Sequence, residues 1–271
     1  MIESPALLDF EIIDETDDYA VVDKPPFLLV HPAKPDGTRT LWQELRGLFA
    51  FEIAAGGQVS IVNRLDRETS GLVLVAKKAD VARRFGLLMQ RRQLKKEYLA
   101  IVYGWPQWES TLVDAALDRQ GKYRDFAIWL KQMIHASGAP AQTEFKVKRR
   151  FVRWPRMARP QPARSGEGAP FESARNAGKF SLIRAIPHTG RTHQIRVHLS
   201  SIGHPIVGDK IYGPDEQLYL RFIETGWTPE LERQLLLRRH ALHSARLAIQ
   251  GEREWTSPLP HDLAEFCSGG L

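Results

Sequence analysis

A short polar segment, residues 63–70, carries the charged side chains whose types and spacing are best suited to chemistry. It reads Asn-Arg-Leu-Asp-Arg-Glu-Thr-Ser, and a glycine and a run of valine and leucine follow directly. That run is too short and too rich in β-branched residues for a helix, so it predicts a buried strand. A loop side chain at the mouth of a core strand is both exposed and held in place. Asp66 is therefore our first candidate for a catalytic carboxylate.

Two other interpretations of this segment stay open on the residues alone. Ion pairs at the entrance to a strand are common, so the segment could be only a salt-bridged turn. The carboxylate could instead be an aspartyl nucleophile for phosphoryl transfer. Against this, no second Asp lies two residues after Asp66, and the chain has no glycine-rich phosphate loop with a lysine.

A second polar cluster, residues 187–199, ends in the run Gly-Arg-Thr-His-Gln-Ile-Arg-Val-His-Leu. Ile195, Leu199 and Ile202 recur at helical spacing, which predicts a helix with Arg196 at the margin of its buried stripe. A guanidinium in that place is partly desolvated and requires a carboxylate partner.

Three histidines near this helix, His193, His198 and His204, raise the question of a metal. The five-residue interval between the first two puts them on different faces of a helix. We therefore predict no metal site.

The composition is that of an ordinary globular protein, with 43% hydrophobic and 26% charged residues among 271. The single cysteine, Cys267, excludes an internal disulfide and favours a reducing compartment. No apolar run approaches the ~20 residues of a membrane span, and the N-terminus is acidic where a signal peptide is basic. We expect a cytoplasmic protein without a membrane segment.

The net charge of +6 is concentrated in residues 146–179, which contain 10 Lys or Arg and only two Glu. Such a patch is the footprint expected for a polyanion, and the interleaved Trp154 and Phe171 favour RNA over a merely solvated loop. Residues 151–178 are rich in Pro, Arg, Gly and Ser without any period, which predicts a long mobile insertion.

Periodicity predicts a mixture of strands and helices along the chain. We expect strands at 10–14, 19–23, 97–103, 142–147, 180–186 and 242–247. Helices are expected after Thr40, Asp80, Thr192, Asp215 and Thr228, with a short one after residue 260. Residues 105–138 give little signal.

Several segments resemble the RluA-type RNA pseudouridine synthases. Residues 64–71 match the signature Arg-Leu-Asp-x-x-Thr-Ser-Gly, residues 96–98 match Lys-x-Tyr, and residues 190–196 match Gly-Arg-x-His-Gln-Ile-Arg. The segment 23–32 is similar to a further family motif, and the resemblance runs from about residue 19 to 262. Two departures are Asn63, where the family commonly has His, and Phe27, where it usually has Gly.

The resemblance implies a catalytic Asp66, an active-site Tyr98 and an Arg196 that pairs with the catalytic carboxylate. Tyr98 alone would be read as a core aromatic, since buried aromatics in strands are usually core. We add RNA contacts as expectations, and they fall on Arg64, Arg67, Lys96, Arg191 and His193.

The resemblance also implies the α+β pseudouridine synthase fold, with a mostly antiparallel bent central sheet, flanking helices and a central RNA-binding cleft. We expect residues 1–271 to form a single catalytic domain and a monomer, without the family's usual N-terminal S4 module.

The function implied is the site-specific isomerisation of uridine to pseudouridine in structured RNA, ribosomal or transfer RNA. The base must leave its stack, and Asp66 would act as nucleophile or as base toward the sugar. The reaction needs no cofactor. The alternative from another class is a non-catalytic RNA-binding or RNA-chaperone protein on the same scaffold, which would not need Asp66, Tyr98 and Arg196 together.

Overall fold

A computed structural model describes residues 10–32, 38–123, 127–153 and 178–268. The chain divides into two compact units. Unit 1 is the chain up to Tyr98 together with His243–Pro258, and unit 2 is Leu99–Leu242 together with Leu259–Leu271. The single catalytic domain stays a prediction. Most of the predicted insertion, with Trp154 and Phe171, lies outside the described residues.

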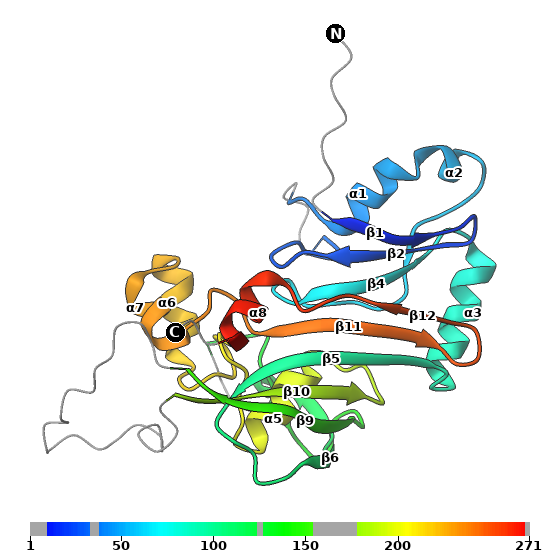
Figure 1. Ribbon diagram of the computed structural model, residues 1–271. Coiled ribbons are helices and arrows are strands. Elements are labelled where there is room, and N and C mark those ends of the chain that lie inside the picture. The colour runs from blue at the N-terminus through cyan, green and yellow to red at the C-terminus, as the bar shows by residue number, and fades with distance from the viewer. Residues whose placement is uncertain (1–9, 33–37, 124–126, 154–177, 269–271) are drawn as a thin grey trace, which may run out of the picture. The chain divides into compact units, whose positions relative to one another are not determined.

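Unit 1 is built on a twisted set of strands in the order β1-β2-β4-β11. These strands are β1 (Glu11–Glu15), β2 (Tyr19–Lys24), β4 (Ser70–Ala76) and β11 (Leu242–Ile249), with β3 (Ser60–Ile61) on β4 and β12 (Arg253–Thr256) on β11. All of these pairs are antiparallel except β4 with β11, which is parallel. Every residue of β4 is buried, as its continuous apolar run predicted. Figure 1 shows β11 and β12 running side by side.

Two described helices of unit 1 form where the spacing of apolar residues predicted them. One predicted helix start was wrong. Helix α1 (Leu41–Leu48) begins at the predicted cap, where the Thr40 side chain accepts a hydrogen bond from the Gln43 amide. Helix α3 (Ala79–Gln90) buries Val81 and Phe85, but it begins before Asp80, which lies in its first turn and does not cap it. A carboxylate there still favours the helix through the dipole. Helix α2 (Ala50–Ala54) is a single short turn.

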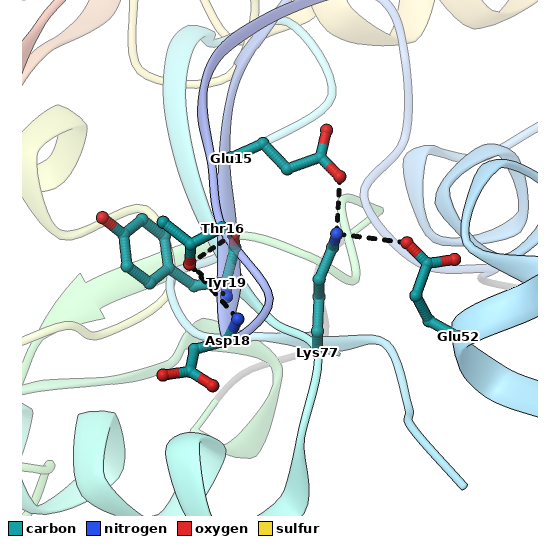
Figure 2. Close-up of polar contacts among 6 residues, drawn as sticks. All are labelled: Glu15, Thr16, Asp18, Tyr19, Glu52 and Lys77. Carbon is teal, nitrogen blue, oxygen red and sulfur yellow. Dashed lines mark hydrogen bonds and ion pairs between the residues drawn. The ribbon is translucent and has the colours of Figure 1, made fainter. Parts of the chain in front are cut away.

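Lys77, at the end of β4, links three segments of unit 1 (Figure 2). Its side chain is nearly buried, and its ammonium contacts Glu15 at the end of β1 at 2.5 Å and Glu52 of α2 at 3.2 Å. The ammonium also lies 4.2 Å from the centroid of the Phe49 ring. The same figure shows Thr16, whose hydroxyl accepts from the amides of Asp18 and Tyr19 and so forms the β1–β2 turn. Lys77 thus fixes where the central strand of the unit ends.

Unit 2 contains the second half of β5 (Leu94–Tyr103) and a further set of strands in the order β5-β10-β9-β6. These are β6 (Ser110–Asp114), β9 (Gln142–Val152) and β10 (Lys179–Pro187), and the pairs β6–β9 and β9–β10 are antiparallel. A separate antiparallel hairpin joins β7 (Leu117–Arg119) to β8 (Gln132–Ile134) and includes the short 3₁₀ turn η1 (Gln120–Lys122). Strand β9 extends through Val152, so the predicted start of the insertion at residue 151 was two residues too early.

Four helices of unit 2 lie within the described residues: α5 (Gln194–Ser201), α6 (Gln217–Thr225), α7 (Pro229–Leu235) and α8 (His261–Ser268). Helix α7 has the predicted proline at its first position, and Thr228 caps it. Helices α6 and α7 share a small core of Leu218, Leu231 and Leu235 and lie side by side in Figure 1.

Helix α8 holds Cys267, which is buried, and burial raises the pKa of this thiol. The Arg149 guanidinium donates to the Cys267 carbonyl at 2.6 Å. None of the helices in the described ranges combines the length and the apolar character that crossing a membrane requires.

The predicted fold class, α+β with mostly antiparallel strands and flanking helices, is confirmed. The central RNA-binding cleft stays a prediction.

Candidate active site

The loop that carries Asp66 is attached to β4 through the side chain of Asn63. The Asn63 amide group donates to the Leu72 carbonyl at 3.0 Å, and its oxygen accepts from the Leu74 amide at 2.8 Å. Asn63 is buried, so these bonds replace those it would make to water. A turn closes the loop, in which the Thr69 amide donates to the Asp66 carbonyl. The residue that departs from the family motif therefore has a structural role here.

A buried lysine supports the same loop from the segment 24–32. The Lys24 ammonium is fully buried and donates to the carbonyls of Pro25, Leu28 and Arg67, at 2.7, 2.9 and 3.3 Å. The Phe27 amide donates to the Arg67 carbonyl at 2.7 Å, and Arg67 Nε donates back to the Phe27 carbonyl at 3.2 Å. The motif around Lys24 thus acts as scaffolding for the loop that carries Asp66.

Phe27 occupies the left-handed region of the backbone, with φ of 71°. This conformation explains why glycine is usual at the position, since an L-residue there costs about 1 kcal/mol or more. We expect Phe27→Gly to raise the free energy of unfolding by up to about 1 kcal/mol, measured by urea denaturation. Phe51→Gly, at an exposed position of helix α2, is the control and should lower it by a similar amount. A loss of stability in both variants would contradict the strain argument.

A buried chain of polar side chains links the end of the loop to β11. The Ser70 hydroxyl lies 3.0 Å from His243 Nδ1, and His243 Nε2 lies 3.1 Å from the Ser257 hydroxyl, which in turn donates to Asp23. Ser70, His243 and Ser257 are all buried. The network fixes where the loop enters the sheet.

Gly71 makes the parallel pairing of β4 with β11 possible. Its φ is +109°, and a Cβ atom on it would lie 2.3 Å from the Ser244 carbonyl oxygen. The Ser-Gly part of the signature is therefore explained by close packing of two strands and one hydrogen bond to His243.

Tyr98 lies in β5 within unit 1, and the negative charge of Asp66 acts on it. Burial is the main cause that raises the pKa of the Tyr98 phenol far above its usual value, and the Asp66 carboxylate adds to the effect. A hydrogen bond with the Ser244 side chain opposes this rise. The phenol is therefore neutral at physiological pH. Two of the three predicted catalytic residues, Asp66 and Tyr98, thus lie in the same unit.

The predicted RNA contacts of unit 1 lie on the loop that carries Asp66 and on β5. Arg64 and Arg67 are exposed, while Lys96 is half-buried two residues before Tyr98, on the same face of β5. Burial lowers the pKa of Lys96. Burial and, to a smaller extent, the Arg64 charge lower the pKa of His31.

Arg196 lies in α5 of unit 2, where it forms a fork-like ion pair with Asp209. Arg196 Nε and Nη2 lie 2.7 and 2.9 Å from the two carboxylate oxygens, and the side chains are 5% and 0% exposed. Asp209 also accepts from the amides of Ile211 and Tyr212. Although burial opposes it, the pKa of Asp209 is held far below its usual range by Arg196. The expected carboxylate partner for a buried Arg196 is thus found in Asp209, while its pairing with Asp66 stays a prediction.

The other predicted residues of unit 2 lie just before α5, in a turn organised by Gln194. The Gln194 side chain accepts from the Arg191 amide at 3.0 Å and donates to the Thr143 hydroxyl at 2.9 Å. Arg191 is exposed, and its Nε donates to the Pro140 carbonyl. His193 Nδ1 lies 2.8 Å from the Tyr212 hydroxyl.

The buried His198 has both ring nitrogens in hydrogen bonds within unit 2. Nδ1 lies 2.9 Å from the Thr143 hydroxyl, and Nε2 lies 3.0 Å from the Ala115 carbonyl oxygen. Its ring therefore ties α5 to two neighbouring segments.

Sequence reasoning missed three residues that hold the candidate site together: His243, Ser244 and Asp209. Asp209 lies within the stretch 19–262 over which the resemblance runs, and His243 is the second residue of a predicted strand, so both were visible as candidates. Their partners are distant in the chain, and only the tertiary structure reveals them.

A family model matches a large part of the chain. Residues 18–201 match the model described as RNA pseudouridylate synthase. This match covers more than half of the chain, and the chain belongs to the RNA pseudouridylate synthase family.

Curated relatives extend over nearly the whole chain. It is 32% identical over 275 residues to the ribosomal large subunit pseudouridine synthase D of Escherichia coli strain K12, covering 97% of this chain and 71% of that protein. It is also 33% identical over 248 residues to an uncharacterized RNA pseudouridine synthase of Chloroflexus aurantiacus, covering 89% of this chain but only 63% of that protein.

A solved structure supports the fold. Human RNA pseudouridylate synthase domain containing 4 matches with a TM-score of 0.64 at 22% identity, over 93% of this chain and 90% of that one.

Proposed function

We propose that this chain isomerises uridine to pseudouridine in RNA, with Asp66 as the essential catalytic residue. One observation supports it above the others: in a member of this family, the carboxylate of the signature acts electrostatically on the buried Tyr98. A non-catalytic RNA-binding protein would have no need of a buried tyrosine beside a supported carboxylate.

The proposed reaction balances without any co-reactant. The bond between N1 of the base and C1′ of the sugar breaks, and a bond between C5 and C1′ forms. The proton on C5 is lost and N1 gains one, so no electron donor or group donor is required. Asp66 acts either as nucleophile or as base toward the sugar.

Tyr98 contributes a neutral phenol to this reaction, because burial keeps it protonated. It stacks against the base after the base has left the helix, and it assists the proton transfer at C5. Removing the base from its stack costs a few kcal/mol, which stacking and positive charge offset.

Arg196 is proposed to serve Asp66 as a counter-charge, as the resemblance implies, with Asp209 holding the guanidinium in place. Arg64, Arg67, Lys96, Arg191 and His193 are proposed to contact the RNA.

Ribosomal RNA is the substrate that the name of the Escherichia coli relative suggests, and transfer RNA is the second candidate. We propose a monomer that works in the cytoplasm, where these RNAs are found.

The test compares RNA from cells with and without this protein. We expect pseudouridine to disappear from one or a few positions of ribosomal or transfer RNA, mapped by chemical labelling and reverse transcription. In a second arm, the purified full chain should release tritium from RNA labelled at C5 of uridine, because that hydrogen is lost in the reaction. An unchanged map together with no tritium release would refute the proposal.

A further inference from the structure

The β7–β8 hairpin of unit 2 exposes two aromatic rings that the proposed chemistry does not use. Trp129 is 64% exposed and Tyr123 is 43% exposed. We call these two side chains, together with Arg119, the aromatic face. Large aromatic rings gain free energy by leaving water, so the exposure of both rings on one small hairpin calls for a partner.

Both rings are held in defined positions. The Arg119 guanidinium lies 4.7 Å from the centroid of the Trp129 ring, and a Cβ atom placed on Gly121 would lie 3.9 Å from that ring. The Tyr123 ring stacks on His135, with 3.8 Å between centroids, and its hydroxyl donates to Asp118. Rings fixed in this way lose little conformational freedom when a partner binds.

The hairpin itself is anchored in the core of unit 2. Leu117 and Ile128 are buried in a cluster that includes Val197 of α5 and Tyr212. The Tyr212 hydroxyl accepts from the Gln132 amide of β8 at 2.8 Å and lies 2.8 Å from His193, one of the predicted RNA contacts. The hairpin that carries the aromatic face is therefore connected through Tyr212 to His193, one of the predicted RNA contacts.

The charges around the aromatic face suit a polyanion. Arg119 is exposed beside Trp129. Asp118, whose carboxylate accepts a hydrogen bond from the Tyr123 hydroxyl, already forms an ion pair with Lys122 at 2.7 Å. An acidic protein surface would satisfy Arg119 but would leave the two rings without flat partners, whereas unpaired bases stack on aromatic and guanidinium planes.

We propose that the aromatic face is a stacking platform for unpaired bases of the RNA substrate, with Trp129 as its main element and Arg119 directed to the phosphate backbone. This inference rests on the proposed function only in taking RNA as the partner. It assigns a binding role to residues outside the matched motifs.

The test measures the affinity of the full chain for a short uridine-rich RNA carrying a fluorescent label, by anisotropy. Trp129→Ala should weaken binding about tenfold, the loss expected for one stacked base, while Trp129→Phe should stay within about threefold of wild type. Phe51→Ala, another exposed aromatic but on α2, is the matched control and should leave affinity unchanged. Thermal unfolding of each variant verifies that it is folded.

The salt dependence of RNA affinity and the steady-state kinetics of the variant provide two further measurements. Loss of stacking should weaken binding equally at low and high salt, whereas loss of a phosphate contact would reduce the slope of log affinity against log salt. With substrate RNA, Trp129→Ala should raise KM and leave kcat unchanged.

The two proposals fail in distinguishable ways. A Trp129→Ala variant that binds RNA as tightly as wild type overturns the platform, even if the enzyme is active. A chain that binds RNA through Trp129 but makes no pseudouridine overturns the proposed function and leaves the platform intact.

Discussion

Asp66→Asn is expected to lower pseudouridine formation by at least about a thousandfold, while RNA affinity stays within a few-fold of wild type. The amide keeps the size of the side chain and the turn closed by the Thr69 amide, but it can act neither as a nucleophile nor as a base. Single-turnover kinetics with C5-tritiated RNA measure the chemical step, and anisotropy measures binding.

Glu68→Gln is the matched control, since it removes a carboxylate from the same loop only two residues away. It should retain most of the activity. Wild-type turnover in Asp66→Asn would refute the catalytic assignment, and equal losses in both variants would point to the charge of the loop rather than to one residue.

Asp209→Asn is expected to lower the free energy of unfolding by about 3–5 kcal/mol, because it removes one partner of a buried ion pair. Both side chains are nearly inaccessible, at 5% and 0% exposed, so water cannot take the place of the lost carboxylate. The uncharged asparagine oxygen is also a weaker acceptor than the carboxylate for the hydrogen bonds that two backbone N–H groups donate to this side chain. Urea denaturation followed by circular dichroism measures the change.

The pH dependence of this effect has a definite sign. The folded-state pKa of Asp209 is depressed, so the pair stabilises the fold above the unfolded carboxyl pKa of about 3.9 and loses this effect as pH falls below it. The difference between wild type and Asp209→Asn should therefore be constant from pH 5 to pH 8, within about 1 kcal/mol, and shrink in acid.

Glu230→Gln provides a comparison in the same unit, because its ion pair with Arg233 is largely exposed. It should change stability by less than about 1 kcal/mol. If Asp209→Asn were equally mild, the buried pair would not be what holds α5 in place.

Local patterns predicted much of the fold because their causes are local. The apolar run of β4, the Thr40 cap of α1 and the proline at the start of α7 each depend on a few adjacent residues. The short strands β7 and β8 lie in the stretch that gave little signal. Each is only three residues long, and pairing between distant segments defines them.

The sequence named the candidate residues of the site, but it did not predict the hydrogen bonds and ion pairs that hold them in place. Asp66 and Tyr98 could be named from motifs, and burial together with the Asp66 charge raises the pKa of the Tyr98 phenol. The bond between Ser70 and His243 spans 173 residues, so no local pattern could reveal it. Asp209 likewise lay within the stretch covered by the resemblance, but only the structure shows that it binds Arg196.

The burial of the lone thiol in α8 makes this protein a convenient background for site-specific labelling. Cys267 is buried, and its raised pKa disfavours the reactive thiolate, so maleimide dyes should not react with it under native conditions. A cysteine introduced at an exposed position such as Phe51 would then carry a single fluorophore without any prior removal of the natural thiol.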